Sequence, residues 1–323
     1  MSKKLAEKLI SVNSMNRIES ISGSLLFFPP NYISNHFSDF FKLKEKRKFD
    51  EAFAIVTSGK GNEISKINSL LSSSLLSLLV FYKLYNNTNK DLYVKFSGLE
   101  ELKFNRCLFE VRNKVIRRPS CVDVLLISED NKTLLFLESK FSEYYDCKFE
   151  KEYGKGYIEL YDELKDLLFP IKFNRDIKDK AQLYSESSCY IEGIKQAISH
   201  LIGLVKGPTD ENLVTSKNDI YVKTEYQEYK QLSKEASEIY FGTILYDPSV
   251  LEEDNLFLCN YIKLYEEIIG KNGSQILDVI KQKYKVKNGQ QKDIKILRKP
   301  LLYTDIDKEY LNKLDKIKDF YGL

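Results

Sequence analysis

Two apolar runs on either side of a short polar turn constrain the fold of this chain more than any other feature. The first run, CVDVLLIS, ends at Ser128, and the second, TLLFLESK, begins at Thr133. Both are apolar at nearly every position instead of alternating, which is typical of strands in the middle of a sheet that is covered on both faces. The residues between them, EDNK, favour a tight turn. We therefore expect a central β-hairpin in an α/β fold.

The turn also predicts which residues of the two strands face each other. If residues 129–132 form a four-residue loop, continued pairing places Asp123 directly opposite Glu138. The β-carbons of directly opposed residues lie roughly 4.5–5.5 Å apart. Lys140 follows Glu138 by two residues, so the alternation of side chains along a strand puts Lys140 on the same face as Glu138.

Two carboxylates this close in an apolar layer repel each other, so one must hold a proton or a divalent cation must lie between them. Two carboxylates beside a lysine favour metal-assisted hydrolysis of a phosphodiester. The metal would neutralise the scissile phosphate and lower the pKa of a bound water, and the lysine would hold the nucleophile. The alternative is that Asp123, Glu138 and Lys140 form a structural ion-pair cluster at the end of the sheet.

The remaining composition excludes several other classes of protein. The chain has 323 residues, 43% of them hydrophobic, and a formal net charge of +3, so it can bury a large core and has no overall field that indicates a charged partner. Its two histidines, His36 and His200, are too few for a multi-histidine metal site. Five scattered cysteines without a CxxC spacing argue against a disulfide framework and against structural zinc. The N-terminal residues lack the pattern of a signal peptide, so we expect a cytoplasmic protein.

The pattern along the chain predicts three regions. We expect a helical segment, a core that carries the hairpin and contains a polar insertion, and a mainly helical extension with one short strand. Between the helix that ends near Val205 and the strand that begins near Glu238 we expect a polar connection. The three regions and the insertion are, in chain order, residues 1–60, residues 61–250 with the insertion at 142–188, and residues 251–323.

The residues around the hairpin resemble a known superfamily. RRPSCVDVLL followed by TLLFLESKFSE is similar to the PD-(D/E)xK superfamily of restriction-endonuclease-like nucleases, with Asp123 as the first motif residue and Glu138, Ser139 and Lys140 as the second part. GKGNEI before a serine-rich helix, LFEV before the Asp123 strand and IKQAISHLIGL after the hairpin look like a bacterial branch of restriction endonucleases. Val122 stands where the motif has proline.

The resemblance covers about half of the chain and implies a restriction-endonuclease-like core, a mixed central sheet flanked by helices. Helical insertions and the helical C-terminal extension lie outside that core. The implied order is a helix, three strands, a second helix and a further strand. These elements map, in that order, to residues 64–86, 106–114, 121–128, 133–141, 190–205 and 238–246.

The resemblance also implies roles for the motif residues. Asp123 and Glu138 would bind Mg²⁺, with Mn²⁺ as a substitute, and Lys140 would assist the attacking water. Members of the superfamily often add a glutamate from the first helix, for which Glu63 is the best match and Glu110 in LFEV the alternative.

A second group of implied residues lies on the helix after the hairpin. Gln196 matches a glutamine that often approaches the active site from this helix. His200 follows one turn later on the same face, and either residue has packing or capping as its alternative role.

The implied function is a Mg²⁺-dependent DNA endonuclease of a prokaryotic restriction or defence system, with a homodimer and a neighbouring DNA methyltransferase gene as further expectations. The alternatives are a repair or recombination nuclease and a non-catalytic nucleic-acid-binding module, and the choice between DNA and RNA stays open. Basic residues near the motif would follow the phosphate backbone or form a solvated polar surface, and tyrosines among them would stack on bases or pack in the core. The basic residues are Arg117, Arg118, Lys148, Lys151, Lys155, Lys172 and Arg175, and the tyrosines are Tyr153, Tyr157 and Tyr161.

Overall fold

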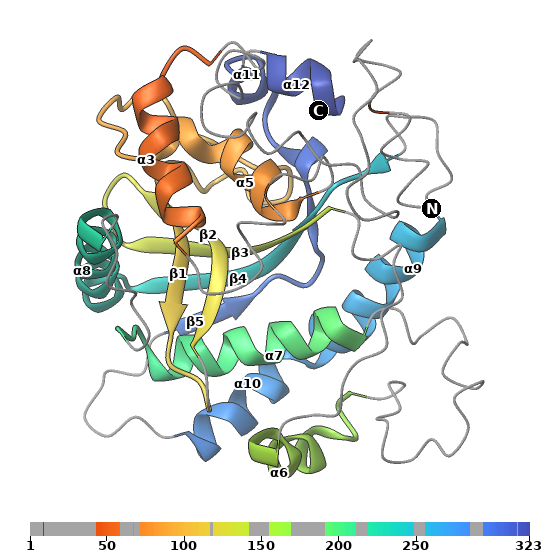
Figure 1. The fold of residues 1–323 in the computed structure, drawn as a ribbon. Coiled ribbons are helices and arrows are strands. Elements are labelled where there is room, and N and C mark those ends of the chain that lie inside the picture. The colour runs from red at the N-terminus through yellow and green to blue at the C-terminus, as the bar shows by residue number, and fades with distance from the viewer. Residues whose placement is uncertain are drawn as a thin grey trace.

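A mixed sheet forms the centre of the part of the chain that the structure describes. The structure is a computed structural model that describes residues 9, 43–58, 67, 72–116, 119–141, 155–168, 191–210, 219–248, 256–284, 293–314 and 316–323. Within these residues the sheet has six strands, in the order β1-β2-β3-β4-β5 with β6 also paired to β4 (Figure 1). The strands are β1 Phe104–Asn113, β2 Ser120–Ser128, β3 Thr133–Lys140, β4 Glu238–Leu245, β5 Asp293–Ile296 and β6 Leu301–Leu302.

The sheet contains an antiparallel half and a parallel half. β1, β2 and β3 are antiparallel neighbours, whereas β4 runs parallel to β3, and β5 and β6 run parallel to β4. A parallel pair needs a long crossover between its strands. Here the crossover from β3 to β4 contains the helices α6 Lys155–Leu164, α7 Ile191–Lys206 and α8 Asp219–Glu235.

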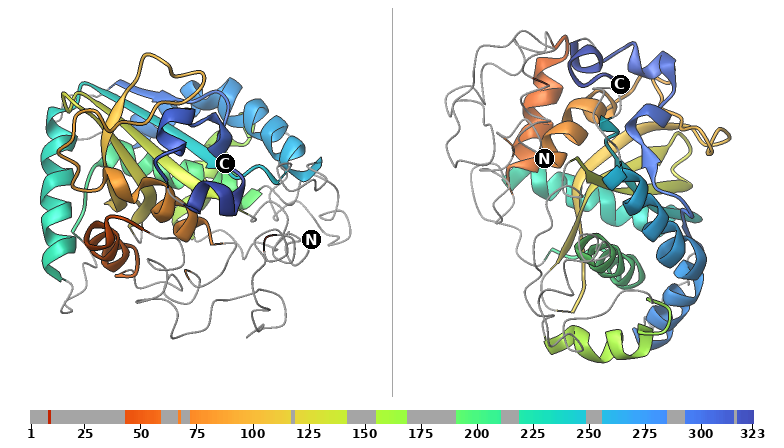
Figure 2. Two further views of the ribbon diagram at one scale, coloured as in Figure 1. Left: turned by 90° about the horizontal axis from the view of Figure 1, so that it is seen from above. Right: turned by 90° about the vertical axis from the view of Figure 1, so that its right-hand side faces the viewer.

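Helices cover both faces of the sheet, as Figures 1 and 2 show. The hydroxyl of Ser139 on β3 donates to the Ser73 carbonyl, 3.2 Å away, and so places α5 on one face. The next side chain towards the N-terminus, Glu138, points the other way and contacts Gln196 of α7. The further helices are α3 Lys46–Val56, α5 Ser73–Phe81 with η2 Tyr82–Leu84, α9 Leu256–Tyr265, η6 Glu266–Gly270, α10 Lys271–Lys283, η7 Tyr303–Asp305, α11 Lys308–Leu311 and α12 Lys316–Tyr321.

The predicted hairpin turn is confirmed. Asn131 has a φ of 62°, the left-handed conformation that asparagine tolerates, and its N–H donates to the Ser128 carbonyl at 3.0 Å. Asp130 accepts from the Ser128 hydroxyl at 2.6 Å and from the Lys132 N–H at 3.0 Å, while the Thr133 N–H donates to the Ser128 oxygen at 2.9 Å. These short-range bonds set the register of the two strands.

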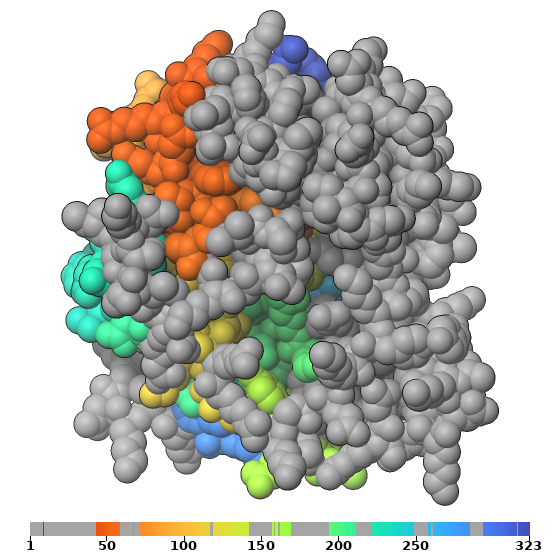
Figure 3. All heavy atoms as spheres, in the orientation of Figure 1, coloured from red at the N-terminus to blue at the C-terminus, as the bar shows by residue number. Residues whose placement is uncertain are grey.

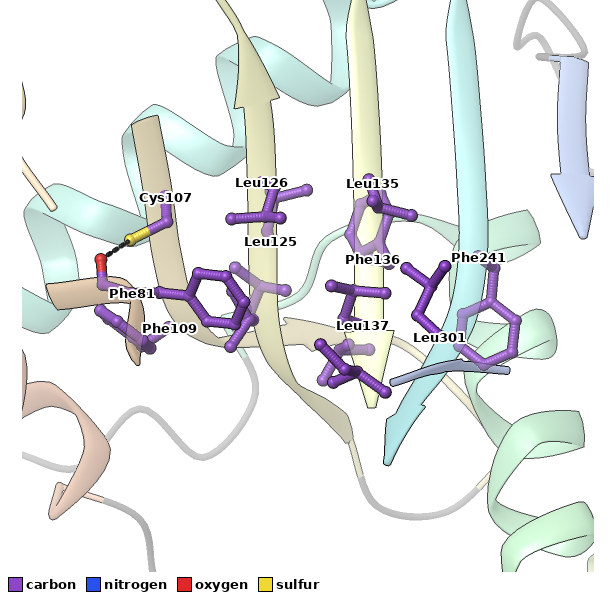
Figure 4. Packing of buried hydrophobic residues seen from close by; sticks show 14 of the residues in the cluster. Phe81, Cys107, Phe109, Leu125, Leu126, Leu135, Phe136, Leu137, Phe241 and Leu301 are labelled. Carbon is purple, nitrogen blue, oxygen red and sulfur yellow. Dashed lines mark hydrogen bonds between the residues drawn. The ribbon is translucent and has the colours of Figure 1, made fainter. Parts of the chain in front are cut away.

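The apolar runs are buried on both faces, as their lack of alternation predicted. Every side chain of residues 124–127 and 134–137 is at most 1% exposed. Figure 4 shows these side chains packed against neighbours on β1 and β4, with the Cys107 thiol donating to the Phe81 carbonyl. The mixed central sheet flanked by helices is therefore confirmed, and this burial places the hairpin in the middle of it.

Three expectations about elements differ from the structure. The first core helix begins only at Ser73, where the Ser72 hydroxyl accepts from the Leu75 N–H and caps it. The polar connection after Val205 contains the 17-residue helix α8, whose narrow apolar stripe includes buried Tyr229 and Leu232 in an otherwise charged sequence. The extension at residues 251–323, expected to hold one short strand, has two among its described residues, β5 and β6, and its last helices are the short η7, α11 and α12.

α3 begins within a charged run and lies at the molecular surface (Figure 3), where the side chain of Arg47 is 93% exposed. The short strand predicted in the C-terminal extension is β5, which joins the central sheet together with β6. The extension at residues 251–323 thus adds two strands to the sheet of the core. None of the helices in the described ranges is long and apolar enough to cross a membrane.

Candidate active site

The structure has the predicted register of the hairpin as far as the pair that precedes the two carboxylates. Val124 pairs with Leu137 as the last pair of the β2–β3 ladder, and one further step along this register places Asp123 opposite Glu138. Asp123 is half-buried, and its Oδ2 accepts a hydrogen bond from the Ser139 N–H at 2.7 Å. Asp123 therefore reaches across to the strand that carries Glu138.

The Glu138 carboxylate is the centre of a buried polar cluster. Its Oε1 lies 2.7 Å from Lys140 Nζ and accepts from Gln196 Nε2 at 2.5 Å. Lys140 also donates to Gln196 Oε1 at 2.8 Å, which closes a triangle of three side chains. On the other side, His200 Nε2 lies 2.9 Å from Glu138 Oε2, and neither atom makes a hydrogen bond of standard geometry with the described residues.

The surroundings of Glu138 keep its carboxyl ionised although it is only 4% exposed. Burial alone would raise the pKa of Glu138, but the electrostatic influence of Lys140 and His200 and their hydrogen bonds outweigh burial and lower that pKa to about 2. The carboxylate is compensated by the lysine and the histidine beside it, whereas removal of Lys140 would leave a buried charge with less compensation.

Ser120 extends the cluster, and the sequence did not predict its part. Its hydroxyl lies 2.5 Å from His200 Nδ1, and its residue is only 8% exposed. Ser120, His200 and Glu138 thus form a continuous line from β2 through α7 to β3. The only sequence signal is a hydroxyl residue at the start of the first apolar run, which is too common to indicate a role.

Ser139, between the two motif residues on β3, secures the opposite face. Its hydroxyl lies 2.8 Å from the Tyr303 hydroxyl, in addition to its bond to the Ser73 carbonyl. Tyr303 belongs to η7, far along the chain. The motif strand is therefore held on one face by α7 and on the other by α5 and η7.

Glu110 lies at an irregular position of β1. Its φ of 49° is left-handed, and the flanking pairs Phe109–Val124 and Val111–Val122 leave it opposite Asp123 without a regular pair. A left-handed residue inside a strand changes the direction of its side chain without shifting the register. Glu110 lines a small cavity with Arg112 and with the buried carboxyl of Glu225 on α8.

Several predicted residues lie outside the described residues. They are Glu63, Arg117, Arg118, Lys148, Lys151, Tyr153, Lys172 and Arg175. Lys155 and Tyr161 belong to α6, but their side chains are not among those described. Tyr157 of the same helix accepts a hydrogen bond from the Ser199 hydroxyl at 3.2 Å and packs against the core, which agrees with its packing role.

Asp123 and Glu138 fit a divalent cation in the type of their donor atoms, because Mg²⁺ prefers carboxylate oxygens. A carboxylate offers about four lone-pair directions, and Lys140, Gln196 and His200 take up three of those on Glu138. Among the described residues no group of three or more His, Cys, Asp or Glu side chains gathers closely enough to hold a metal ion. Glu63, or oxygens of water and substrate, would complete a ligand set around the two carboxylates.

Comparison of the chain with protein-family models, with curated proteins and with solved structures finds no significant match. The geometry of this site and the resemblance of its motif therefore remain as the indications of function.

Proposed function

We propose that this protein is a metal-dependent nuclease of the PD-(D/E)xK type. The observation that carries the proposal is the arrangement at the end of the hairpin. The register aligns Asp123 with Glu138, and Lys140 lies 2.7 Å from the Glu138 carboxylate. This is the set of side chains, in the spacing and strand context, that the superfamily motif implies.

The order of the elements supports the proposal. A helix (α5), three antiparallel strands (β1, β2 and β3), a helix (α7) and a strand parallel to β3 (β4) follow one another along the chain. The superfamily core implies the same succession. The insertion between β3 and α7 and the C-terminal strands are additions to it.

Asp123 and Glu138 would hold the cation, each from its own strand. A divalent cation at this place neutralises charge on a phosphodiester and lowers the pKa of a bound water. Glu138 is ionised and so is ready to act as a ligand without losing a proton. Asp123, which is half-buried, lies nearer to the solvent side from which a nucleic acid would approach.

Lys140 and Gln196 would handle the attacking water and the charge that develops on the phosphate. The ammonium of Lys140 is fixed by Glu138 and Gln196, and beside the cation it would orient the water and offset negative charge in the transition state. Gln196 keeps Lys140 in position because its carbonyl oxygen accepts from Lys140 while its amide group donates to Glu138.

The proposed substrate is DNA and the proposed role is in a prokaryotic restriction or defence system, because the motif and its flanking residues resemble restriction endonucleases. Cleavage of both strands by one site per chain would favour a homodimer, whose symmetry mirrors the target. A repair or recombination nuclease would use the same residues on DNA of another shape.

The test is cleavage of DNA by the full chain and by variants of the motif. Supercoiled plasmid and branched or single-stranded DNA are incubated with protein and Mg²⁺ or Mn²⁺, and products are followed on gels. We expect Asp123→Ala and Lys140→Ala each to reduce the cleavage rate by at least roughly 100-fold, because each removes charge stabilisation or positioning at the reacting phosphate.

Lys295→Ala is the matched control. Lys295 makes an ion pair of the same kind, 2.6 Å from Glu238, at the other end of β4, and its loss should leave cleavage unchanged. Cleavage that survives both Asp123→Ala and Lys140→Ala would contradict the proposal and favour a structural role of the cluster.

A further inference from the structure

The backbone pairing of β2 and β3 stops just before the two carboxylates. Val124 and Leu137 are the last paired residues, so no regular ladder pair fixes the distance between Asp123 and Glu138. Side-chain interactions replace the ladder at this point. One is the bond from the Ser139 N–H to Asp123, and the other is the line from Ser120 on β2 through His200 to Glu138 on β3.

The two contacts of His200 decide which of its nitrogens carries hydrogen. An ionised carboxylate offers only acceptors, so a hydrogen lies on Nε2, the nitrogen 2.9 Å from Glu138 Oε2, although the contact does not have the angle of a standard hydrogen bond. Nδ1 then either accepts from the Ser120 hydroxyl or, on a charged ring, donates to the Ser120 oxygen. In both cases the contact with Ser120 holds the ring with Nε2 against Glu138.

His200 is also held rigidly. Its residue is 2% exposed, and its ring centroid lies 5.9 Å from that of Phe241 on β4. Because α7 carries both His200 and Gln196, side chains of one helix contact both oxygens of the Glu138 carboxylate. That carboxylate is therefore enclosed from two sides.

We propose that His200, oriented by Ser120, is a positioning residue that holds Glu138 for the divalent cation. The inference rests on the proposed function, since it concerns the same cation. Side chains that bind and orient a metal ligand commonly affect metal affinity by about 10–100-fold when they are removed. A purely packing role of His200 would affect stability without this effect on affinity.

The experiment measures Mn²⁺ binding to the full chain by calorimetry and by electron paramagnetic resonance, without nucleic acid. We expect His200→Ala to weaken binding by about 10–100-fold. His200→Gln restores a donor near the position of Nε2 and should recover most of the affinity. Ser120→Ala should weaken binding in the same direction but less, because Phe241 and α7 still hold the ring. Thermal unfolding of each variant confirms that it is folded.

Ser199→Ala is the matched control on α7. Ser199 precedes His200, but its hydroxyl bonds to Tyr157 instead of the cluster, and Mn²⁺ affinity should not change. If His200→Ala is not obtained folded, His200→Gln and Ser120→Ala still test the positioning role. Ser120→Ala must then weaken Mn²⁺ binding more than His200→Gln does.

The outcomes separate this inference from the proposed function. Wild-type affinity in folded His200→Ala, or in Ser120→Ala if the first variant does not fold, would overturn the positioning role while Mg²⁺-dependent cleavage by the wild type still stands. A wild-type chain that neither binds Mn²⁺ nor cleaves DNA would overturn the proposed function, and the inference with it.

Discussion

Glu138 and Glu225 are both buried carboxyl groups, yet their pKa values move in opposite directions. The pKa of Glu138 falls because two nearby basic groups compensate its charge. Glu225 is 6% exposed, and its Oε1 accepts from the Phe109 N–H while its Oε2 has no partner among the described residues. Burial therefore raises the pKa of Glu225 well above its usual value. The surroundings thus favour the ionised form of Glu138 and the protonated form of Glu225.

Glu225→Gln should stabilise the protein at neutral pH. A raised pKa in the folded state means that the stability due to Glu225 is complete below the pKa of the unfolded chain and is lost as the pH rises through the folded pKa. Glutamine mimics the protonated acid at every pH, so the variant does not lose this stability as the pH rises. We expect the unfolding midpoint in urea to exceed that of the wild type at pH 7 and to converge with it near pH 4.

Glu228→Gln on the same helix is the control for this prediction. Glu228 lies 2.7 Å from Arg106 in a partly exposed ion pair, so its loss should lower stability slightly or not at all. Equal effects of the two substitutions, or a lower stability of Glu225→Gln at pH 7, would show that the Glu225 carboxyl is not held protonated.

At the scale of elements, α7 reaches the site because it lies unusually close to β1. A Cβ atom at Gly203 would be 2.7 Å from the Asn113 Cβ, closer than side chains approach one another. Asn113 is fully buried, and its Oδ1 accepts from the Tyr229 hydroxyl at 2.5 Å, so it is not free to move away. Gly203 thus permits the close approach of α7, and His200 lies one turn before it.

Gly203→Ala should therefore destabilise the protein although alanine favours helices. Overpacking costs about 1–3 kcal/mol, which exceeds the helix preference of alanine over glycine, about 1 kcal/mol at most. Unfolding in urea at pH 7 measures the difference. The same variant should bind Mn²⁺ more weakly, because a shift of α7 moves His200 and Gln196 away from Glu138. Stability equal to or above that of the wild type would show that α7 can move without cost.

At the scale of the whole molecule, the C-terminal residues are integrated into the core instead of forming a separate unit. β5 and β6 pair with β4, and Tyr303 contacts Ser139 of the motif strand. Tyr310 donates to the Val80 carbonyl on α5 at 2.8 Å, and Tyr246 donates to the Tyr321 carbonyl at 2.6 Å. These bonds are buried, so their removal would leave unpaired polar groups inside the protein.

A chain that ends at residue 250 should consequently fail to fold cooperatively. It would expose one edge of β4 and the apolar surface that α9–α12 cover. We expect a broad thermal transition by circular dichroism and binding of a hydrophobic dye, which indicate loosely packed structure. Tyr303→Phe in the full chain, which removes one hydroxyl, should cost only about 1 kcal/mol. A sharp transition of the shortened chain near the wild-type midpoint would show instead that residues 61–250 fold without the C-terminal residues.

The sequence predicts those parts of the fold that depend on neighbouring residues. The turn at residues 129–132 and the two uninterrupted apolar runs are local features, and they were enough to predict the hairpin and the alignment of Asp123 with Glu138. The helix α8 was missed because most of its residues are polar and its apolar stripe is narrow. Hydrophobic periodicity is a weak signal in such a helix.

The contacts of the site that come from distant parts of the chain could not be predicted. Ser120 and His200 meet only because α7 packs closely against β1 at Gly203, and Tyr303 reaches Ser139 only after β5 and β6 have joined the sheet. The left-handed conformation of Glu110 has no local cause such as a glycine or an asparagine, so it results from tertiary packing.

The contact between Tyr303 and Ser139 has a consequence for the order of events during synthesis. The motif strand leaves the ribosome long before η7 does. About half of the chain is translated between Ser139 and Tyr303, so the contact between them can form only after that. For the proposed nuclease, made in a cell that contains its own DNA, this delay would be protective. A nascent or prematurely terminated chain would carry the hairpin residues of the motif without the Tyr303 contact, so under this proposal the host genome would meet the enzyme only as a finished molecule.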